Sequence, residues 1–151
     1  MGNTLELNTG DMIGFKADNG KWLSRINRGL PEPIEAAKSE VDVYCKFEVL
    51  VLELDDFKVA LKADNGKWLG LRDRSGVEAI EAGFGERVQE CSFTFNVVDD
   101  LRIVLKADNG KWLGRVNRGL PEPIEAAKSE INSYCLFRVI NFNLSYAFGT
   151  P

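Results

Sequence analysis

Two segments of this chain carry the same set of polar and aromatic side chains. Each segment combines two arginines, an asparagine, a glutamate, a lysine and a tyrosine. Guanidinium, amide and carboxylate groups form directional hydrogen bonds to hydroxyls, and a flat aromatic face stacks on apolar C–H surface. This is the chemistry of a shallow sugar site. The candidate ligand-binding residues are Arg25, Asn27, Arg28, Glu32, Lys38 and Tyr44 in one segment, and Arg115, Asn117, Arg118, Glu122, Lys128 and Tyr134 in the other.

Both segments belong to a repeat that occurs three times. The octapeptide KADNGKWL begins at Lys16, Lys62 and Lys106. The three tryptophans and the three cysteines follow the same period: they are Trp22, Trp68, Trp112, Cys45, Cys91 and Cys135. A period in the forties indicates one supersecondary unit used three times.

The middle copy keeps the octapeptide but loses most of the polar set. Residues 16–40 and 106–130 agree everywhere except at Ser24/Gly114 and Ile26/Val116, whereas the middle copy differs at many positions after its tryptophan. It has Leu71, Asp73, Phe84 and Glu90 where the other copies have Arg, Asn, Lys and Tyr. Two interpretations stay open. Either the first and third copies bind ligand, with avidity for a multivalent glycan, or the set is a solvated surface left by a recent duplication.

Other residue groups are weaker candidates for a site. All three copies keep the tryptophans, which core packing explains better than sugar stacking does. The Asp18-Asn19-Gly20 segment has ordinary turn chemistry. Three thiols without a fourth ligand or a C-x-x-C spacing predict no metal site, and an odd number at equivalent places predicts free, buried thiols rather than a disulfide framework. No cofactor is expected.

Catalysis has little support in the sequence. The chain has no histidine, so a Ser-His-Asp triad cannot form. The carboxylate pairs Glu32 with Glu35 and Glu122 with Glu125 would need a cleft and one raised pKa for glycoside hydrolysis. We therefore expect a protein that is not an enzyme.

The elements that must position these residues are short strands. Asn-Gly in each octapeptide predicts a hairpin closed by a two-residue type I′ turn, with Ala17 opposite Trp22. Alternation at Cys45, Phe47 and Val49 predicts a half-buried strand, and 34–38 is expected to form a further short strand.

Four short strands in each of three units predict an all-β fold, the β-trefoil, with pseudo-threefold symmetry. The sequence predicts a single domain over 1–151, with repeats at approximately 12–52, 57–98 and 102–142. A propeller would need more blades, and a solenoid would show capping repeats.

Composition excludes several partners. The chain of 151 residues has a formal charge of −4 and no basic run, which argues against nucleic acid. No apolar stretch approaches the roughly 20 residues that span a bilayer. The first residues lack the basic and apolar parts of a signal peptide, so a cytoplasmic location is expected.

The pattern LKADNGKWL at 61–69 and 105–113 resembles the repeat signature of fascin-like β-trefoils and of the amaranthin-type agglutinins. The resemblance covers roughly 12–142. It implies a lectin for galactose or N-acetylgalactosamine type glycans, or alternatively a fascin-like actin-binding or scaffold module. The resemblance also implies sites that can lie at a subunit interface, but the agglutinins carry two trefoils in tandem and one is expected here, which argues against an interface site.

An apolar stripe follows the last repeat. Phe142, Leu144, Tyr146 and Phe148 alternate with polar or small residues. This segment either pairs with Leu5 and Leu7 and closes the barrel, or forms a homodimer contact, since exposed apolar stripes mark interfaces.

Overall fold

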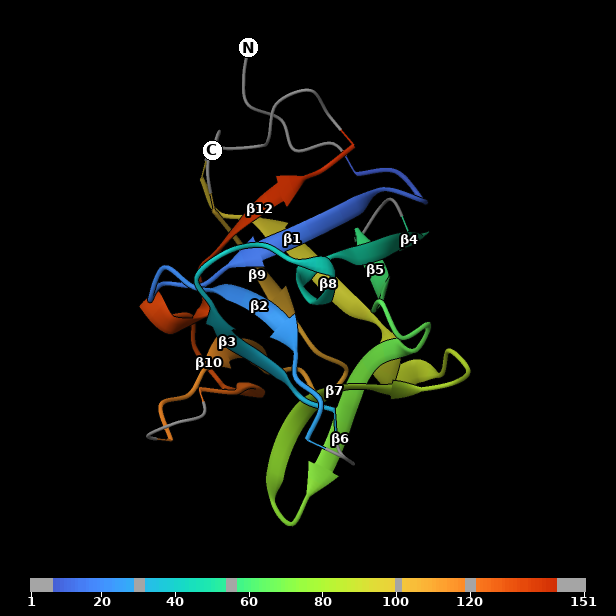
Figure 1. The fold of residues 1–151 in the computed structure, drawn as a ribbon. Coiled ribbons are helices and arrows are strands. Elements are labelled where there is room, and N and C mark those ends of the chain that lie inside the picture. Colours follow the sequence, from blue (N-terminus) through green and yellow to red (C-terminus); the bar gives the residue numbers. More distant parts are fainter. Residues whose placement is uncertain (1–6, 29–31, 54–56, 100–101, 119–121, 144–151) are drawn as a thin grey trace.

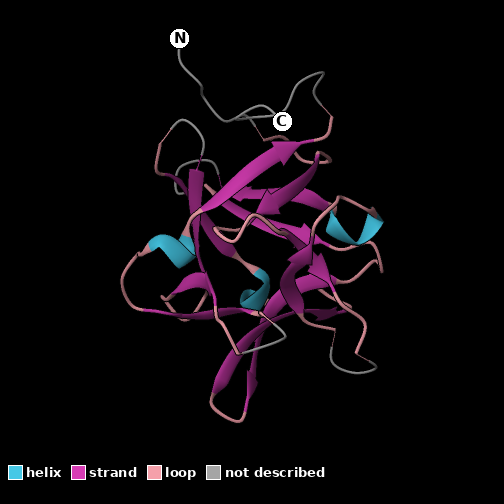
Figure 2. Ribbon diagram, turned by 60° about the vertical axis from the view of Figure 1, so that its left-hand side comes forward, coloured by secondary structure: helices cyan, strands magenta, loops and turns pink. Residues whose placement is uncertain are grey.

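The chain folds almost entirely into short strands (Figure 1). A computed structural model describes residues 7–28, 32–53, 57–99, 102–118 and 122–143. Within these ranges the helical segments are three single 3-10 turns, η1 (Val43–Cys45), η2 (Gln89–Cys91) and η3 (Ser133–Cys135), each ending on a cysteine (Figure 2). The expectation of an all-β protein is confirmed.

Each copy of the sequence repeat contributes four strands. The first copy has β1 (Met12–Lys16), β2 (Trp22–Arg25), β3 (Ile34–Lys38) and β4 (Phe47–Glu53). The second has β5 (Lys58–Lys62), β6 (Trp68–Arg74), β7 (Val77–Phe84) and β8 (Phe93–Val97). The third has β9 (Arg102–Lys106), β10 (Trp112–Arg115), β11 (Ile124–Lys128) and β12 (Phe137–Asn141).

The strands are joined by antiparallel pairing into one closed arrangement. A ring of pairings runs through β1, β4, β5, β8, β9 and β12 and returns to β1. The hairpins β2–β3, β6–β7 and β10–β11 extend from this ring, and β7 pairs with β11. In Figure 1 the β6–β7 hairpin projects furthest. Closure leaves the ring without an exposed edge.

The core lies inside this ring and follows the period of two that the sequence shows. Its largest fully buried side chains include Phe15, Phe47, Phe93, Phe95 and Phe137. The cysteines are also buried, at the end of the 3-10 turns rather than within the following strands. Burial of such large apolar side chains is the main favourable contribution to folding.

The predicted turn of the first hairpin is wrong in type. Gly20 has φ of 81°, but no positive φ occurs at Asn19. Gly20 N–H donates to Ala17 O at 3.0 Å and Ala17 N–H to Lys21 O at 2.8 Å, which is a three-residue loop with glycine in the left-handed position. The longer loop shifts the register, so Lys16 rather than Ala17 pairs with Trp22.

The same geometry recurs at the other two Asn-Gly hairpins, where Lys62 pairs with Trp68 and Lys106 with Trp112. The lysine ammonium lies 4.9 to 5.4 Å from the tryptophan ring centroid in the three copies. The tryptophans are therefore half-buried under lysines, not in the core.

A two-residue turn with both φ angles positive does occur, but at the tip of the β6–β7 hairpin. Ser75 has φ of 59° and Gly76 of 89°, and the flanking Arg74 and Val77 pair directly. Asp73 supports the turn by accepting a hydrogen bond from Gly76 N–H at 2.9 Å. The middle copy thus makes a longer hairpin because its loop sequence closes a tight turn.

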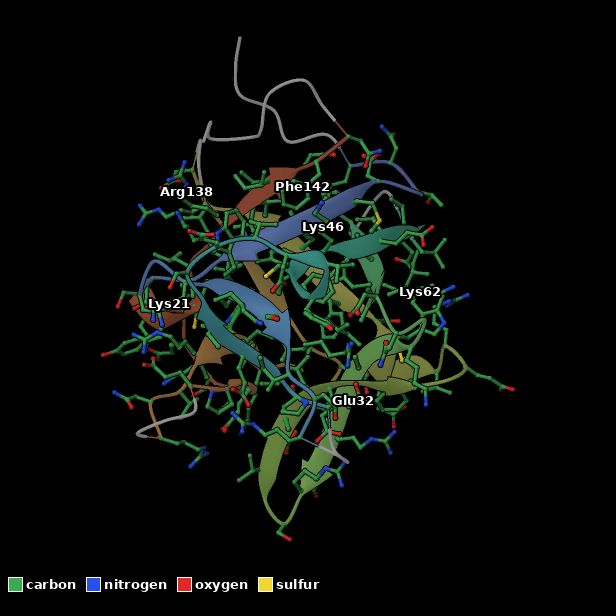
Figure 3. The ribbon with its side chains drawn as sticks, viewed as in Figure 1. Lys21, Glu32, Lys46, Lys62, Arg138 and Phe142 are labelled. Atoms are coloured by element: carbon green, nitrogen blue, oxygen red, sulfur yellow. The ribbon has the colours of Figure 1, made fainter. Side chains whose placement is uncertain are left out.

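The chain end packs on the first strand as far as it is described. Phe142 N–H donates to Met12 O at 2.8 Å, and its ring lies over Gly14, where an added Cβ would come within 2.9 Å of the ring. Lys46 stacks on the same ring (Figure 3). Leu7 is buried, but Leu5, Leu144, Tyr146 and Phe148 lie outside the described residues. The homodimer contact therefore stays a prediction.

The thiols give a direct test. All three cysteines are buried and free, and burial raises the pKa of each thiol. We expect a thiol reagent to react slowly with the native protein and to find three thiols per chain in denaturant without reductant. Fewer than three would mean a disulfide.

Gly70 gives a second test, of packing. A Cβ there would lie 2.4 Å from the ring of Phe84, so Gly70→Ser should lower the free energy of unfolding by about 1–3 kcal/mol. Gly114→Ser is the matched control, because Ser24 occupies that place in the first copy and the neighbour of Gly114 is the flexible Lys128. Equal losses for the two variants in urea titrations would contradict this account.

Candidate functional site

The structure divides the predicted residues of the first copy into two groups. Arg25, Asn27, Lys38 and Tyr44 line a shallow hollow of about 270 Å³, together with Ile26. Arg25 ends β2, Lys38 ends β3 and Tyr44 lies in η1, so three elements meet there. Arg28 and Glu32 do not line the hollow. Glu32 accepts a hydrogen bond from Arg25 at its edge, and Arg28 pairs with Glu35.

The tyrosine forms the aromatic surface of the hollow. Tyr44 is 41% exposed, as its outward orientation in the sequence predicts. Its N–H donates to the side chain of Asp42 at 3.0 Å, which fixes η1. The Arg25 guanidinium lies 5.1 Å and the Lys38 ammonium 5.4 Å from the ring centroid, so cation–π attraction holds the three side chains together.

The third copy repeats this arrangement. Tyr134 is 43% exposed and its N–H donates to Asn132 at 3.0 Å. Arg115 lies 5.0 Å and Lys128 5.4 Å from the ring centroid. The middle copy has Glu90 at the tyrosine position, and its Arg72 stacks instead on Phe84 at 4.3 Å. The two similar copies therefore share a side-chain cluster that the middle copy lacks.

Arg25 also joins the first repeat to the second. Its Nε and Nη2 donate to the two carboxylate oxygens of Asp64, each at 2.8 Å, and its Nη1 donates to Glu32. The Arg25 side chain is 10% exposed. The hydrogen bond to Asp64, followed by the bond to Glu32, raises the pKa of Arg25 despite partial burial. Such bidentate, charge-assisted pairs are among the stronger polar interactions in proteins.

Arg115 makes the equivalent connection from the third repeat to the first. It donates to both oxygens of Asp18 at 2.8 Å and also to Glu122. Between the second and third repeats Leu71 takes the arginine position, and Asp108 accepts instead from Gln89 Nε2 at 2.8 Å. Asp18 and Asp64, which the sequence presents only as turn residues, are thus partners of the candidate site.

A glutamate just before or at the start of each third strand holds the turn of the neighbouring repeat. Asn65 Nδ2 lies 3.4 Å from Glu32 Oε1, and Asn19 Nδ2 lies 3.4 Å from Glu122 Oε1. Asn109 donates to Glu78 in the same way. Figure 3 shows Glu32 beside β6 and β7. All three copies keep this contact, including the middle one, which indicates a structural role for Glu32 and Glu122.

The second arginine of each set also has a structural partner. Arg28 and Arg118 form bidentate pairs with Glu35 and Glu125 at 2.6 to 2.8 Å. The middle copy does the same with Arg74 and Glu81. These glutamates are buried, and a buried carboxylate needs a paired cation. Arg28 and Arg118 therefore compensate the charge of buried carboxylates, which is a structural role.

The described residues show no metal centre and no membrane span. They contain no group of three or more Cys, Asp or Glu side chains arranged to hold an ion. In the same part of the chain, no helix has the length and apolarity needed to cross a membrane.

Comparison with known proteins shows the fold. No protein-family model matches the chain, and no curated protein matches it. Among solved structures it is similar to the BEL β-trefoil, with a TM-score of 0.72 and 13% identity over 93% of this chain and 99% of that one.

Two further structures agree. The designed threefold symmetric protein ThreeFoil has a TM-score of 0.68 and 16% identity, over 85% of this chain and 96% of that chain. The SDF2-like protein of Arabidopsis thaliana has a TM-score of 0.68 and 13% identity, over 89% of this chain and 94% of that chain. The chain therefore has the β-trefoil fold, and these comparisons do not single out the fascin-like or amaranthin-type family.

The connection between repeats leads to a stability prediction. Arg25→Leu copies the residue of the middle repeat and leaves Asp64 without its guanidinium partner. The free energy of unfolding should fall by about 2 kcal/mol, as for hydrogen bonds to charged groups. Arg102→Leu is the control: its pair with Asp99 is 48% and 40% exposed, and such pairs contribute about 0–1 kcal/mol.

A double-mutant cycle with Asp64→Asn isolates the coupling between Arg25 and Asp64. Urea titrations of the single and double variants give its size. A coupling no larger than the loss caused by Arg102→Leu would show that the connection between these repeats contributes little.

Proposed function

We propose that this chain is a non-catalytic carbohydrate-binding protein: a β-trefoil of three four-stranded repeats with pseudo-threefold symmetry, and with ligand sites in the first and third repeats. Each site consists of the half-exposed tyrosine, the lysine and the asparagine, with the arginine held against the ring, and in the first repeat these residues line the hollow. The residues are Asn27, Lys38, Tyr44 and Arg25, and Asn117, Lys128, Tyr134 and Arg115.

The observation that carries this proposal is the hollow beside Tyr44. It is open and shallow, as suits the end of a glycan rather than a deeply enclosed cofactor. Tyr44 supplies exposed aromatic surface for the C–H groups of a sugar, and Asn27 and Lys38 supply polar groups for hydroxyls. The rigid position of Arg25 against the ring lowers the entropy lost when ligand binds.

Galactose or N-acetylgalactosamine type glycans are the proposed ligands, on the strength of the sequence resemblance to the amaranthin-type agglutinins. The alternative, a fascin-like actin-binding or scaffold module, would use the same fold for a protein surface. Fold by itself does not choose between them, so the site residues must be tested.

A glycan array followed by calorimetric titration tests the proposal, and we expect two sites per chain. Tyr44→Ala with Asn27→Ala should weaken one site roughly tenfold or more, because each lost hydrogen bond or stacking contact costs on the order of 1 kcal/mol. The matching changes at Tyr134 and Asn117 should remove the other site.

Glu90→Ala is the matched control, since Glu90 occupies the tyrosine position of the middle repeat and is exposed. It suits this purpose better than Asp73, which holds the turn at Gly76. Three sites per chain, unchanged binding in folded double variants, or actin co-sedimentation without glycan binding would each contradict the proposal.

A further inference from the structure

The two candidate sites differ in charge at one position beneath the tyrosine. In the first repeat Asp42 precedes η1, and in the third repeat Asn132 takes its place. The Oδ1 atom of each side chain makes the same two contacts. It accepts a hydrogen bond from the backbone N–H of the tyrosine two residues later at 3.0 Å, and it lies 3.5 Å from the Sγ of the following cysteine. The substitution therefore leaves the local fold unchanged.

The second terminal atom of that side chain makes the difference. Asp42 Oδ2 pairs with the ammonium of Lys38 at 3.2 Å. The corresponding atom of Asn132 is an amide nitrogen, which is a donor and cannot accept from Lys128. Among the described residues, no carboxylate forms an ion pair with Lys128.

The balance of charge around the two rings follows from this. Near Tyr44 the two cations are Arg25 and Lys38. They face three carboxylates, those of Glu32, Asp64 and Asp42. Around Tyr134, the two cations Arg115 and Lys128 face only two carboxylates. Lys128 is half-buried, and its ammonium lies 5.4 Å from the centroid of the Tyr134 ring. In this position the ammonium can donate a hydrogen bond to an acceptor group of a bound ligand.

We propose that the third-repeat site takes an acidic saccharide, with Lys128 binding a carboxylate or sulfate substituent next to the sugar that stacks on Tyr134, whereas the first-repeat site takes the neutral sugar. This inference rests on the proposed function and assigns a ligand class to one of its two sites. A charge-assisted hydrogen bond to an ammonium is about twice as strong as a neutral one, so the substituent decides which site is occupied first.

Two isosteric swaps test the inference. Asp42→Asn makes the first site like the third, and Asn132→Asp makes the third like the first, and each keeps the Oδ1 contacts. The probes are methyl β-galactoside, its C6 carboxylate analogue methyl β-galacturonide, and galactose 6-sulfate. Amide NMR signals of Tyr44 and Tyr134 report the two sites separately in one titration.

In the unmodified protein, the galacturonide should bind the third site about tenfold more tightly than the first. Asp42→Asn should raise the affinity of the first site for it about tenfold, and Asn132→Asp should lower that of the third by the same factor. Neither swap should change binding of the neutral galactoside by more than about twofold. The preference should weaken in 0.5 M salt because the interaction is electrostatic.

Equal affinity of both sites for the galacturonide, or no response to either swap while the galactoside still binds, overturns this inference and leaves the proposed function standing. Binding of inorganic sulfate at the third site as tightly as galactose 6-sulfate also overturns it, because the sugar would then contribute nothing. Failure of all three sugar probes to bind overturns both proposals.

Discussion

Hydrogen bonds between neighbouring repeats are the interaction on which the rest of this structure depends. The asparagine of each KADNGKWL turn reaches a carbonyl in its own repeat and a glutamate of the preceding one, as in Asn65 with Ala82 and Glu32. One repeat therefore cannot satisfy its turn alone. This explains why the octapeptide is identical in all three copies, including the copy that has lost the candidate ligand residues.

The candidate sites are built on the same connections. Arg25 and Arg115 bind an aspartate of the next repeat with one edge of the guanidinium and lie against a tyrosine. The candidate sites and the packing of the repeats thus share an arginine side chain, and the position of that arginine against the tyrosine depends on the contact between repeats. In the middle repeat Leu71 removes both features together.

Copies with almost the same sequence need not have the same chemistry. The first and third repeats place their arginine, lysine and tyrosine at distances that agree within about 0.1 Å. Under the ring they differ in one terminal atom, where Asp42 has an oxygen and Asn132 a nitrogen, and beside it Val116 replaces Ile26. This change removes the carboxylate partner of one lysine ammonium without altering the local backbone contacts.

The sequence by itself determined the period, the all-β class, the strand at Ile34–Lys38 and the outward tyrosines, because these follow from local alternation and spacing. It also predicted three buried thiols, as the structure has them. Only the tertiary structure determined which aspartates pair with the arginines of the candidate sites. Asp64 lies 39 residues from Arg25 along the chain, and Asp18 lies 97 from Arg115, so no local pattern pairs them. The prediction of a two-residue Asn-Gly turn was wrong for the same reason. Asn19 forms its hydrogen bonds with residues from another strand and another repeat. These distant contacts favour a loop one residue longer than the local sequence predicts.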